Sequence, residues 1–338
     1  MHGNGRSAGE SHRIARRPAR VPGTIAGFFP DFETGKKVRQ RTFLCIECQF
    51  CTATLRKDPG AASRRTEKYM PENAYVHGYS PRESERLSDQ ARTLTDLLHH
   101  DTRYPAGSHV LEAGCGTGAQ TVILARNSPD AFITSVDISE ESVEKAKERV
   151  QEEGLANVRF RVGDLFSLPF AEESFDHIFV CFVLEHLPDP GLALLRLLPL
   201  LKHGGTITVI EGDHGSAFFH PESPEAGQAI RCLIGLQKDA GGDALIGRKL
   251  YPLVTGAGFS GVRVSPRLVY VDASRPELVE GFTKLTFTAM VDGVRGEAIA
   301  RGMMSEAGWD AGIRGLLRTC EPDGSFCYLF FKATGIRE

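Results

Sequence analysis

The feature that most constrains the fold is a glycine-rich stretch that follows a short apolar run. Residues 110–118 read VLEAGCGTG, which predicts a strand, a loop nearly free of side chains, and a helix that begins near residue 118. Glycines in such a loop let the backbone approach a ligand closely. The dinucleotide pattern G-x-G-x-x-G does not fit, because its third glycine would fall at Thr121. Glu112, directly before the loop, is also unsuited to a pyrophosphate and can instead act through the loop on an ammonium group.

Short apolar runs alternate with amphipathic segments on both sides of this loop. Strands are predicted at 109–113, 133–137, 158–163, 177–182, 206–211, 262–271 and 326–334. Helices are predicted at 81–100, 118–127, 140–153, 190–201, 222–238 and 247–257, with two or three more across 275–319. Apolar strands separated by helices indicate a parallel sheet covered on both faces. Pro266 predicts that its strand lies at a sheet edge or carries a break.

Four elements in this order resemble a class I S-adenosylmethionine-dependent methyltransferase. They are the E-x-G-x-G-x-G loop, an Asp that ends the second strand, an Asp after the third, and the start of the fourth at residues 175–179. Within this class, the sequence is similar to the small-molecule methyltransferases of ubiquinone and menaquinone biosynthesis. This resemblance implies an α/β, Rossmann-like fold, with a seven-stranded, mostly parallel sheet, helices on both faces and helical insertions after strands 5 and 6.

The resemblance also implies a set of cofactor-binding residues for S-adenosylmethionine. Asp137 would accept hydrogen bonds from the two ribose hydroxyls, and Ile138 would pack against the adenine. Asp164 would accept a hydrogen bond from the adenine amino group, with Leu165 beside it. The loop contributes Glu112, Gly114, Cys115, Gly116 and Gly118. An Asp at a strand end also commonly caps a helix, which is the alternative for both acids. Asp176 is expected to support the loops rather than to contact the cofactor.

An entry segment before the first strand carries the remaining part of the resemblance. Residues 75–80 and 86–91 are similar to the segment that folds over the cofactor in these enzymes and in sterol C-methyltransferases. Tyr79 and Gln90 would then face the methionyl end. Alternatively, Tyr79 is a packing aromatic and Gln90 a solvated helix position.

Methyl transfer from a sulfonium is an in-line displacement, so the protein must align the reactants, exclude water and sometimes remove a proton. Two clusters follow the strands that reach the binding edge: Glu185-His186 after strand 4 and Glu211 to His214 after strand 5. His214, His186 and Glu211 are therefore the catalytic candidates, since a histidine can accept a proton near neutral pH. The alternative is that these side chains pin the loops.

An apolar acceptor is predicted from aromatic and methionine residues beyond strand 5. They are Phe218, Phe219, Phe282, Phe287, Met290, Met303 and Met304. Such a lining suits an apolar small molecule as the methyl acceptor. At helical spacing, however, the same residues also commonly form ordinary core.

Charge divides the chain unevenly. Residues 1–65 hold 13 basic and 5 acidic residues, whereas the remainder holds 27 and 38. We interpret 1–69 as a basic, disordered extension, with Met70 as an alternative start of translation. Residues 70–338 would form the methyltransferase domain, with its core at 105–215 and substrate-side helices at 216–260 and 273–320.

The basic extension raises the alternative of a nucleic-acid methyltransferase. The acidic body would repel phosphates, and neither an Asn/Asp-Pro-Pro-Tyr/Phe tetrad nor a Pro-Cys nucleophile follows the strands. The sequence therefore does not favour a nucleic-acid partner. A protein that binds the cofactor without transferring a methyl group is the other alternative. A homo-oligomer stays open, because the entry segment could exchange between subunits.

The cysteines indicate a compartment rather than a metal site. Five are scattered singly, as in proteins of the reducing cytoplasm, where we expect this chain to reside. Cys45, Cys48 and Cys51 have a ligand-like spacing, but no fourth ligand follows them, so no metal is predicted. No uncharged apolar run approaches the roughly 20 residues that a membrane-spanning helix needs, so a soluble protein without a membrane partner is expected.

Overall fold

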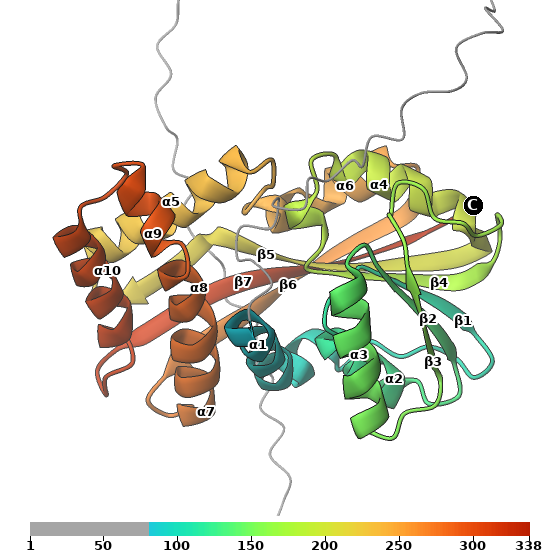
Figure 1. Cartoon of the computed structure of the whole chain (residues 1–338), viewed down its shortest axis with the longest axis horizontal. Helices are drawn as coiled ribbons and strands as arrows, with labels where there is room; N and C mark the ends of the chain where they lie inside the picture. Colours follow the sequence, from blue (N-terminus) through green and yellow to red (C-terminus); the bar gives the residue numbers. More distant parts are fainter. Residues whose placement is uncertain (1–80) are drawn as a thin grey trace, which may run out of the picture. The chain divides into compact units, whose positions relative to one another are not determined.

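The computed structural model describes residues 81–338, and a seven-stranded sheet lies at its centre (Figure 1). The strands follow the spatial order β3-β2-β1-β4-β5-β7-β6. Their bounds are β1 (His109–Ala113), β2 (Phe132–Asp137), β3 (Val158–Val162), β4 (Phe175–Cys181), β5 (Leu201–His220), β6 (Ser260–Asp272) and β7 (Ser325–Ile336). Strands β1 to β5 run parallel, whereas β7 runs antiparallel between β5 and β6. The predicted seven-stranded, mostly parallel sheet is therefore confirmed.

Helices connect the strands, and several of them begin at a polar cap. The larger helices are α1 (Pro81–His99), α2 (Ala119–Asn127), α3 (Glu140–Glu152), α4 (Pro190–Leu197), α5 (Pro224–Asp239), α6 (Leu250–Gly256) and α10 (Glu306–Arg318). Shorter helical segments are η1 (Leu184–His186), η2 (Leu198–Leu200), η3 (Ile246–Lys249), α7 (Pro276–Leu278), α8 (Ala289–Asp292) and α9 (Arg295–Ala300), and η4 (Val279–Thr288) is a π-helix. The side chains of Ser139, Asp189, Ser223 and Ser305 accept a backbone N–H at the starts of α3, α4, α5 and α10. Each cap satisfies a donor that the first helical turn cannot.

Two apolar cores lie on the two faces of the sheet. One core includes Leu94 of α1, Leu124 of α2 and Trp309 of α10. The other lies under α4 and α6 and includes Leu194 and Val254. Figure 1 shows α4 and α6 on the face opposite α1, α2 and α3. The expected covering of both faces is thus present.

The order of the strands reverses between β1 and β4. From that point β2 and β3 lie on one side and β5 on the other. In open α/β sheets, ligands bind beyond the carboxyl ends of the strands at such a reversal. The loops after β1 and β4 are therefore where a site is expected.

The largest difference from the predicted elements concerns β5. It was predicted at 206–211 but extends from Leu201 to His220, because β7 pairs with it again at Phe218–His220 after an irregularity. Residues 216–220, expected to begin the substrate-side helices, are therefore strand. Pro266 lies on β6, the edge strand, as its missing N–H predicted.

The helices after β5 and β6 also divide differently from the expectation. α6, within the expected substrate-side segment 216–260, packs against α4 rather than against the pocket. The region 275–319 contains a ten-residue π-helix, η4, between shorter α-helical pieces. Long π-helices are rare and occur mostly at functional sites.

Several predictions fall on segments outside the described residues. These are the extension at 1–69, the alternative start at Met70, the entry-segment Tyr79, and the triplet Cys45, Cys48 and Cys51. Within residues 81–338, no helix combines the length and the apolar character needed to cross a membrane.

Replacing Gly118 by alanine is expected to destabilise the fold by about 1–3 kcal/mol. Gly118 precedes α2 at φ +82°, and a Cβ there would lie 2.9 Å from the Ala146 Cα on α3. Gly154→Ala is the matched control, because Gly154 has φ +65° but open space around its Cβ position. Urea denaturation should show the larger loss for Gly118→Ala. Equal losses would mean that the α2–α3 contact contributes nothing.

Candidate active site

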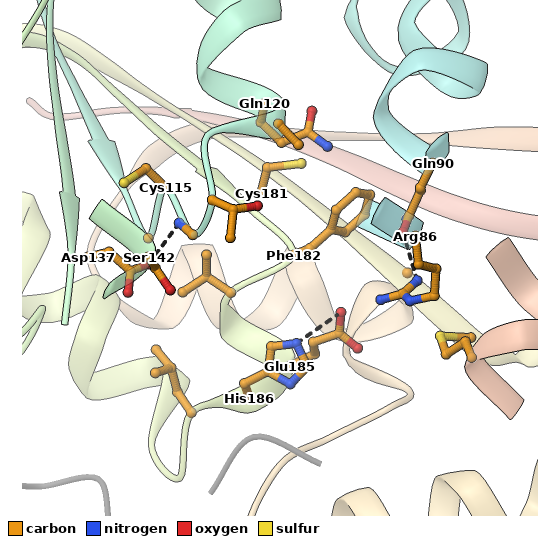
Figure 2. A pocket seen from close by; sticks show the side chains of 18 of the residues that line it. Arg86, Gln90, Cys115, Gln120, Asp137, Ser142, Cys181, Phe182, Glu185 and His186 are labelled. Atoms are coloured by element: carbon orange, nitrogen blue, oxygen red, sulfur yellow. Dashed lines mark hydrogen bonds and ion pairs between the residues drawn. The ribbon is translucent and has the colours of Figure 1, made fainter. Parts of the chain in front are cut away.

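A pocket opens at the carboxyl ends of the central strands and continues toward α1, η4 and β7. Its first part is bounded by the loop after β1 and by residues that follow β2, β3 and β4. Its second part is bounded by side chains of α1, η4 and β7. Figure 2 shows Asp137 and Cys115 on one side, Arg86 and Gln90 on the other, and Phe182 between them. The pocket thus joins the glycine loop to an aromatic compartment.

The glycine loop is held tightly against β2 and β4. Gly114 has φ +85°, and a Cβ on it would overlap the Val183 side chain, so no other residue fits there without rearrangement. Gly116 donates its N–H to Asp137 Oδ2 at 2.8 Å, and Cys115 donates to the Val136 carbonyl at 2.9 Å. A Cβ at Gly116 would meet no atom within 4 Å, so the backbone at this position borders open space.

The two predicted acids lie along the same pocket. Asp137, at the end of β2, and Asp164, after β3, both line it. Burial raises the pKa of Asp137, although the backbone N–H groups of Ser139 and Gly116 oppose the rise. Asp164 Oδ1 accepts the Phe166 N–H at 2.9 Å. Both carboxylates therefore combine local backbone bonds with a position on the pocket wall.

Two apolar side chains accompany these acids. Leu165 and Ile138 line the pocket, and the Ile138 residue is 37% exposed. An exposed isoleucine beside an acid at a strand end leaves an apolar surface that a flat ring would cover. The structure thus brings together Gly114, Cys115, Gly116, Asp137, Ile138, Asp164 and Leu165, as predicted.

Glu112 and Gly118 shape the loop from behind and do not line the pocket. The Glu112 carboxylate is 2% exposed, and its Oε2 accepts hydrogen bonds from Thr121 Oγ1 at 2.7 Å and Ser135 Oγ at 2.6 Å. Its Oε1 is buried and has no hydrogen-bond partner among the described residues. Burial raises the pKa of Glu112 to about 7 despite those two hydroxyls. A buried, half-satisfied carboxyl behind the loop would gain from a nearby cation.

The raised pKa of Glu112 predicts a pH-dependent stability. Because folding favours the protonated carboxyl, the wild type should lose stability as pH rises from about 4.5 through about 7. Glu112→Gln has no ionisable carboxyl and should not lose this stability. The difference in free energy of unfolding between the variant and the wild type should therefore shift in favour of the variant by about 2–3 kcal/mol between pH 5 and pH 8. Urea denaturation of both proteins at the two pH values measures this. Parallel curves would contradict the assignment.

The far part of the pocket is lined mainly by aromatic side chains. They are Phe182 after β4, Phe282 and Phe287 of η4, and Tyr328 and Phe330 of β7. Phe182 has φ +57°, a conformation that is rare for a bulky residue and that occurs mostly at functional sites.

Of the aromatic and methionine residues expected to line an acceptor site, some line the pocket and others do not. Phe282, Phe287 and Met290 line the pocket. Phe219, Met303 and Met304 belong to the apolar core instead, and Phe218 is 60% exposed outside the pocket. Phe282 and Phe287 of η4 both pack against the Tyr328 ring of β7, with ring centroids 5.7 and 5.5 Å apart.

A polar cluster lies at the end of the aromatic compartment. His214 Nδ1 lies 2.7 Å from the Tyr328 hydroxyl, and His214 Nε2 lies 3.7 Å from Glu185 Oε2. The other Glu185 oxygen, Oε1, lies 3.7 Å from His186 Nε2. Gln237 Nε2 donates to Glu185 Oε2 at 3.0 Å. Both candidate histidines thus share one carboxylate.

Charges within this cluster influence one another. Burial alone would raise the pKa of the Glu185 carboxyl, but the imidazoles of His186 and His214 hold it below its ordinary value. Burial lowers the pKa of His214, and the Glu185 carboxylate opposes that effect. His214 is therefore neutral near pH 7 with an anion close to one ring nitrogen.

Glu211, the third catalytic candidate, does not line the pocket. Its Oε1 accepts the backbone N–H groups of Val183 at 3.0 Å and Leu184 at 2.8 Å. Burial raises the pKa of Glu211 well above its ordinary value, and the negative charge of Glu185 raises it further. Glu211 therefore anchors the loop after β4 from the far side.

The remaining predicted residues and the unpredicted ones fall on α1 and β7. Gln90 lines the pocket and is buried, not solvated, and its Oε1 accepts from Arg86 Nη1 at 3.2 Å. Tyr328 and Phe330 were not singled out from the sequence, and Arg86 was noted only as the first residue of the entry-segment block 86–91. Arg86 lies one helical turn before Gln90, which is a signal the sequence did contain. Asp176 lies away from the pocket, where it accepts from His109 N and Lys202 Nζ, as expected.

The sheet with its antiparallel last strand, the glycine loop after β1 and the acids after β2 and β3 agree with the arrangement that the resemblance to class I S-adenosylmethionine-dependent methyltransferases implies. Residues 105–255 match the family described as "Methyltransferase domain". This match covers the strands and loops that bound the first part of the pocket.

Several curated proteins are similar to parts of this chain. The chain is similar to methyltransferase GfsG of Streptomyces halstedii, 31% identical over 40% of this chain and 49% of that protein. A demethylmenaquinone methyltransferase of Listeria welshimeri is 33% identical over 32% of this chain and 47% of that protein. An uncharacterized 37.1 kDa protein in transposon TN4556 of Streptomyces fradiae is 27% identical over 80% of this chain and 79% of that protein. The chain spans about half the length of most of the curated relatives it matches.

Proposed function

We propose that this protein transfers a methyl group from S-adenosylmethionine to a small, apolar or aromatic molecule. The observation that carries the proposal is a single pocket that joins the glycine loop and two acids to an aromatic compartment. A sulfonium bound at the loop would point its methyl group toward an acceptor in that compartment. Methyl transfer by in-line displacement requires such an arrangement.

The residues of the first part of the pocket fit the cofactor. In this proposal Asp137 accepts hydrogen bonds from the ribose hydroxyls, and Asp164 and Leu165 receive the adenine; the position of all three on the pocket wall supports these roles. The open space at Gly116 lets the backbone approach the methionyl part. The partnerless Glu112 oxygen favours the cationic ammonium group through the loop. The bound cofactor would supply the activated methyl group.

The chain's own contribution is alignment, exclusion of water and removal of a proton. Alignment in a closed pocket can lower a barrier by about 7–11 kcal/mol. Of the three catalytic candidates, we propose His214 as the base, because it lines the aromatic compartment and burial keeps it neutral. His186 shares Glu185 and remains the second candidate, whereas Glu211 is proposed to hold the loop.

The partners and location are proposed on narrower grounds. A small-molecule acceptor fits the apolar lining, whereas a nucleic-acid partner would depend on residues 1–65, which lie outside the described part. Cys115, Cys181, Cys232, Cys320 and Cys327 are free thiols, which supports a reducing compartment such as the cytoplasm. A homo-oligomer remains a proposal from the entry segment.

Calorimetry and a transfer assay test this function. S-adenosylhomocysteine titrated into the full chain should bind with a micromolar dissociation constant, about −8 kcal/mol. The full chain should then form S-adenosylhomocysteine from S-adenosylmethionine in the presence of members of a panel of phenols, quinols, indoles and amines. Absence of binding heat with folded protein would overturn the cofactor assignment. Binding without transfer to any panel member would favour a binding protein that lacks transferase activity.

A further inference from the structure

One ring nitrogen at the end of the aromatic compartment has no hydrogen bond. His214 is 5% exposed, and its Nε2 is buried without a hydrogen-bond partner among the described residues. Its other nitrogen, Nδ1, is engaged by the Tyr328 hydroxyl at 2.7 Å. An unpaired buried polar atom costs free energy unless a ligand satisfies it. His214 lines the pocket, so a polar group on a bound ligand could satisfy this nitrogen.

The neighbours of His214 determine what that group does. When Nδ1–H donates to the Tyr328 oxygen, Nε2 keeps its lone pair and accepts a hydrogen bond. Burial raises the pKa of Tyr328 well above its ordinary value, so its hydroxyl keeps its proton. Glu185 Oε2, at 3.7 Å from Nε2, then stabilises the imidazolium that forms when Nε2 takes a proton. The arrangement is suited to an acceptor that gives up a proton.

The walls and charges restrict the rest of the acceptor. Phe282, Phe287 and Phe330 form an apolar lining that suits a flat ring. Arg86 lines the same pocket and is buried on α1. A guanidinium beside the compartment disfavours an alkylammonium acceptor, which would carry a like charge. A neutral hydroxylated ring is apolar enough for this lining and carries no charge that Arg86 would repel.

We propose that the methyl acceptor is a hydroxyl group on a flat apolar ring, a phenol or ring enol, and that Glu185 is a positioning residue that prepares His214 for its proton. This inference rests on the proposed function. His214 Nε2 removes the hydroxyl proton, and the oxygen attacks the methyl carbon. The C–S bond breaks with its electron pair on sulfur, which leaves S-adenosylhomocysteine and a methyl ether. The proton leaves His214 for solvent once the product has departed.

Matched ring compounds test the acceptor class. The full chain is given S-adenosylmethionine with a deuterated methyl group and, separately, 1-naphthol, 1-naphthylamine and 1-methoxynaphthalene, followed by a wider set of phenols and their amines. We expect labelled methyl ethers from hydroxyl compounds at least about tenfold faster than labelled amines. Faster transfer to nitrogen or to ring carbon would overturn the proposal. So would absence of ether from every hydroxyl compound with protein that binds S-adenosylhomocysteine, whereas absence of that binding would refute the proposed function itself.

The pH profile tests the role of Glu185. The charged and titratable groups facing His214 are Glu185, His186, Arg86 and Asp213, with the Tyr328 hydroxyl on its other side. Glu185→Gln keeps the side-chain shape but removes the anion, so the pKa of His214 should fall. The rising limb of turnover against pH should therefore move to lower pH by about half a unit or more, and plateau turnover should drop about twofold or more because the base is weaker.

Two further variants separate positioning from folding. Glu173→Gln, at an exposed ion pair with Arg337 far from the pocket, should leave both limb and plateau unchanged. Glu185→Asp retains the negative charge, so its turnover should rise over the same pH range as that of the wild type. If Glu185→Gln does not fold, Glu185→Asp is the variant that tests the role. A merely structural Glu185 would lower turnover without moving the limb. That result, or a displaced limb in Glu185→Asp, would overturn the role.

Discussion

Replacing Asp137 by alanine is expected to weaken the binding of S-adenosylhomocysteine by about 10²–10⁴-fold. Each hydrogen bond to a charged acceptor contributes about 1.5–3 kcal/mol, and two ribose hydroxyls would lose theirs. The change also removes the acceptor for the Gly116 N–H, which holds the glycine loop to β2. Both effects act on the cofactor side of the pocket. Isothermal titration calorimetry of wild type and variant measures the change in dissociation constant.

A matched aspartate shows whether the effect is local. Asp176 also accepts a backbone N–H, that of His109, but lies at the opposite end of the strands. Asp176→Ala should therefore keep the affinity within about threefold. Asp137→Asn retains an oxygen for the loop but loses the charge, so its affinity should be intermediate. Affinity within about threefold in Asp137→Ala would remove Asp137 from the site.

The cofactor half of the pocket was accessible from the sequence because its determinants are local. The predicted first strand has the observed bounds of β1, His109–Ala113. The glycines are required by positive φ values and by contacts such as that of Gly114 with Val183. Asp137 and Asp164 follow strands that alternate regularly with helices, so strand ends alone place both acids at one edge. Backbone geometry and spacing fix these positions.

The acceptor half depends on pairings between distant segments. Tyr328 meets His214 only because β7 runs antiparallel to β5, across 114 residues of sequence. The length of β5 depends on the same pairing with β7. The sequence around Gly212 and Gly215 contains no local pattern that predicts this pairing. Glu211 is a residue type that can act as a catalytic acid or base. Its carboxylate instead accepts hydrogen bonds from backbone N–H groups of the loop after β4, and tertiary packing determines this orientation. Residue type therefore predicted chemistry there but not position.

Replacing His214 by alanine is expected to lower turnover by about 10²–10⁴-fold, the contribution of a positioned base. Cofactor affinity should stay within about threefold, because Asp137 and the glycine loop are untouched. In the wild type, turnover should rise as His214 loses its proton, and burial places that pKa below 6.5. Steady-state kinetics against pH, with calorimetry for the cofactor, measures both quantities.

The control for this variant is a half-buried histidine outside the pocket. Burial also lowers the pKa of His177, which lies on β4 with its Nδ1 2.8 Å from Thr206 Oγ1. His177→Ala should therefore keep its turnover even if it loses stability. His186→Ala should have a smaller effect than His214→Ala, because His214 has a hydrogen bond to Tyr328 that orients its ring and an Nε2 without a hydrogen-bond partner among the described residues. Unchanged turnover in His214→Ala would mean that the acceptor needs no base, and that the unpaired nitrogen serves only to bind it.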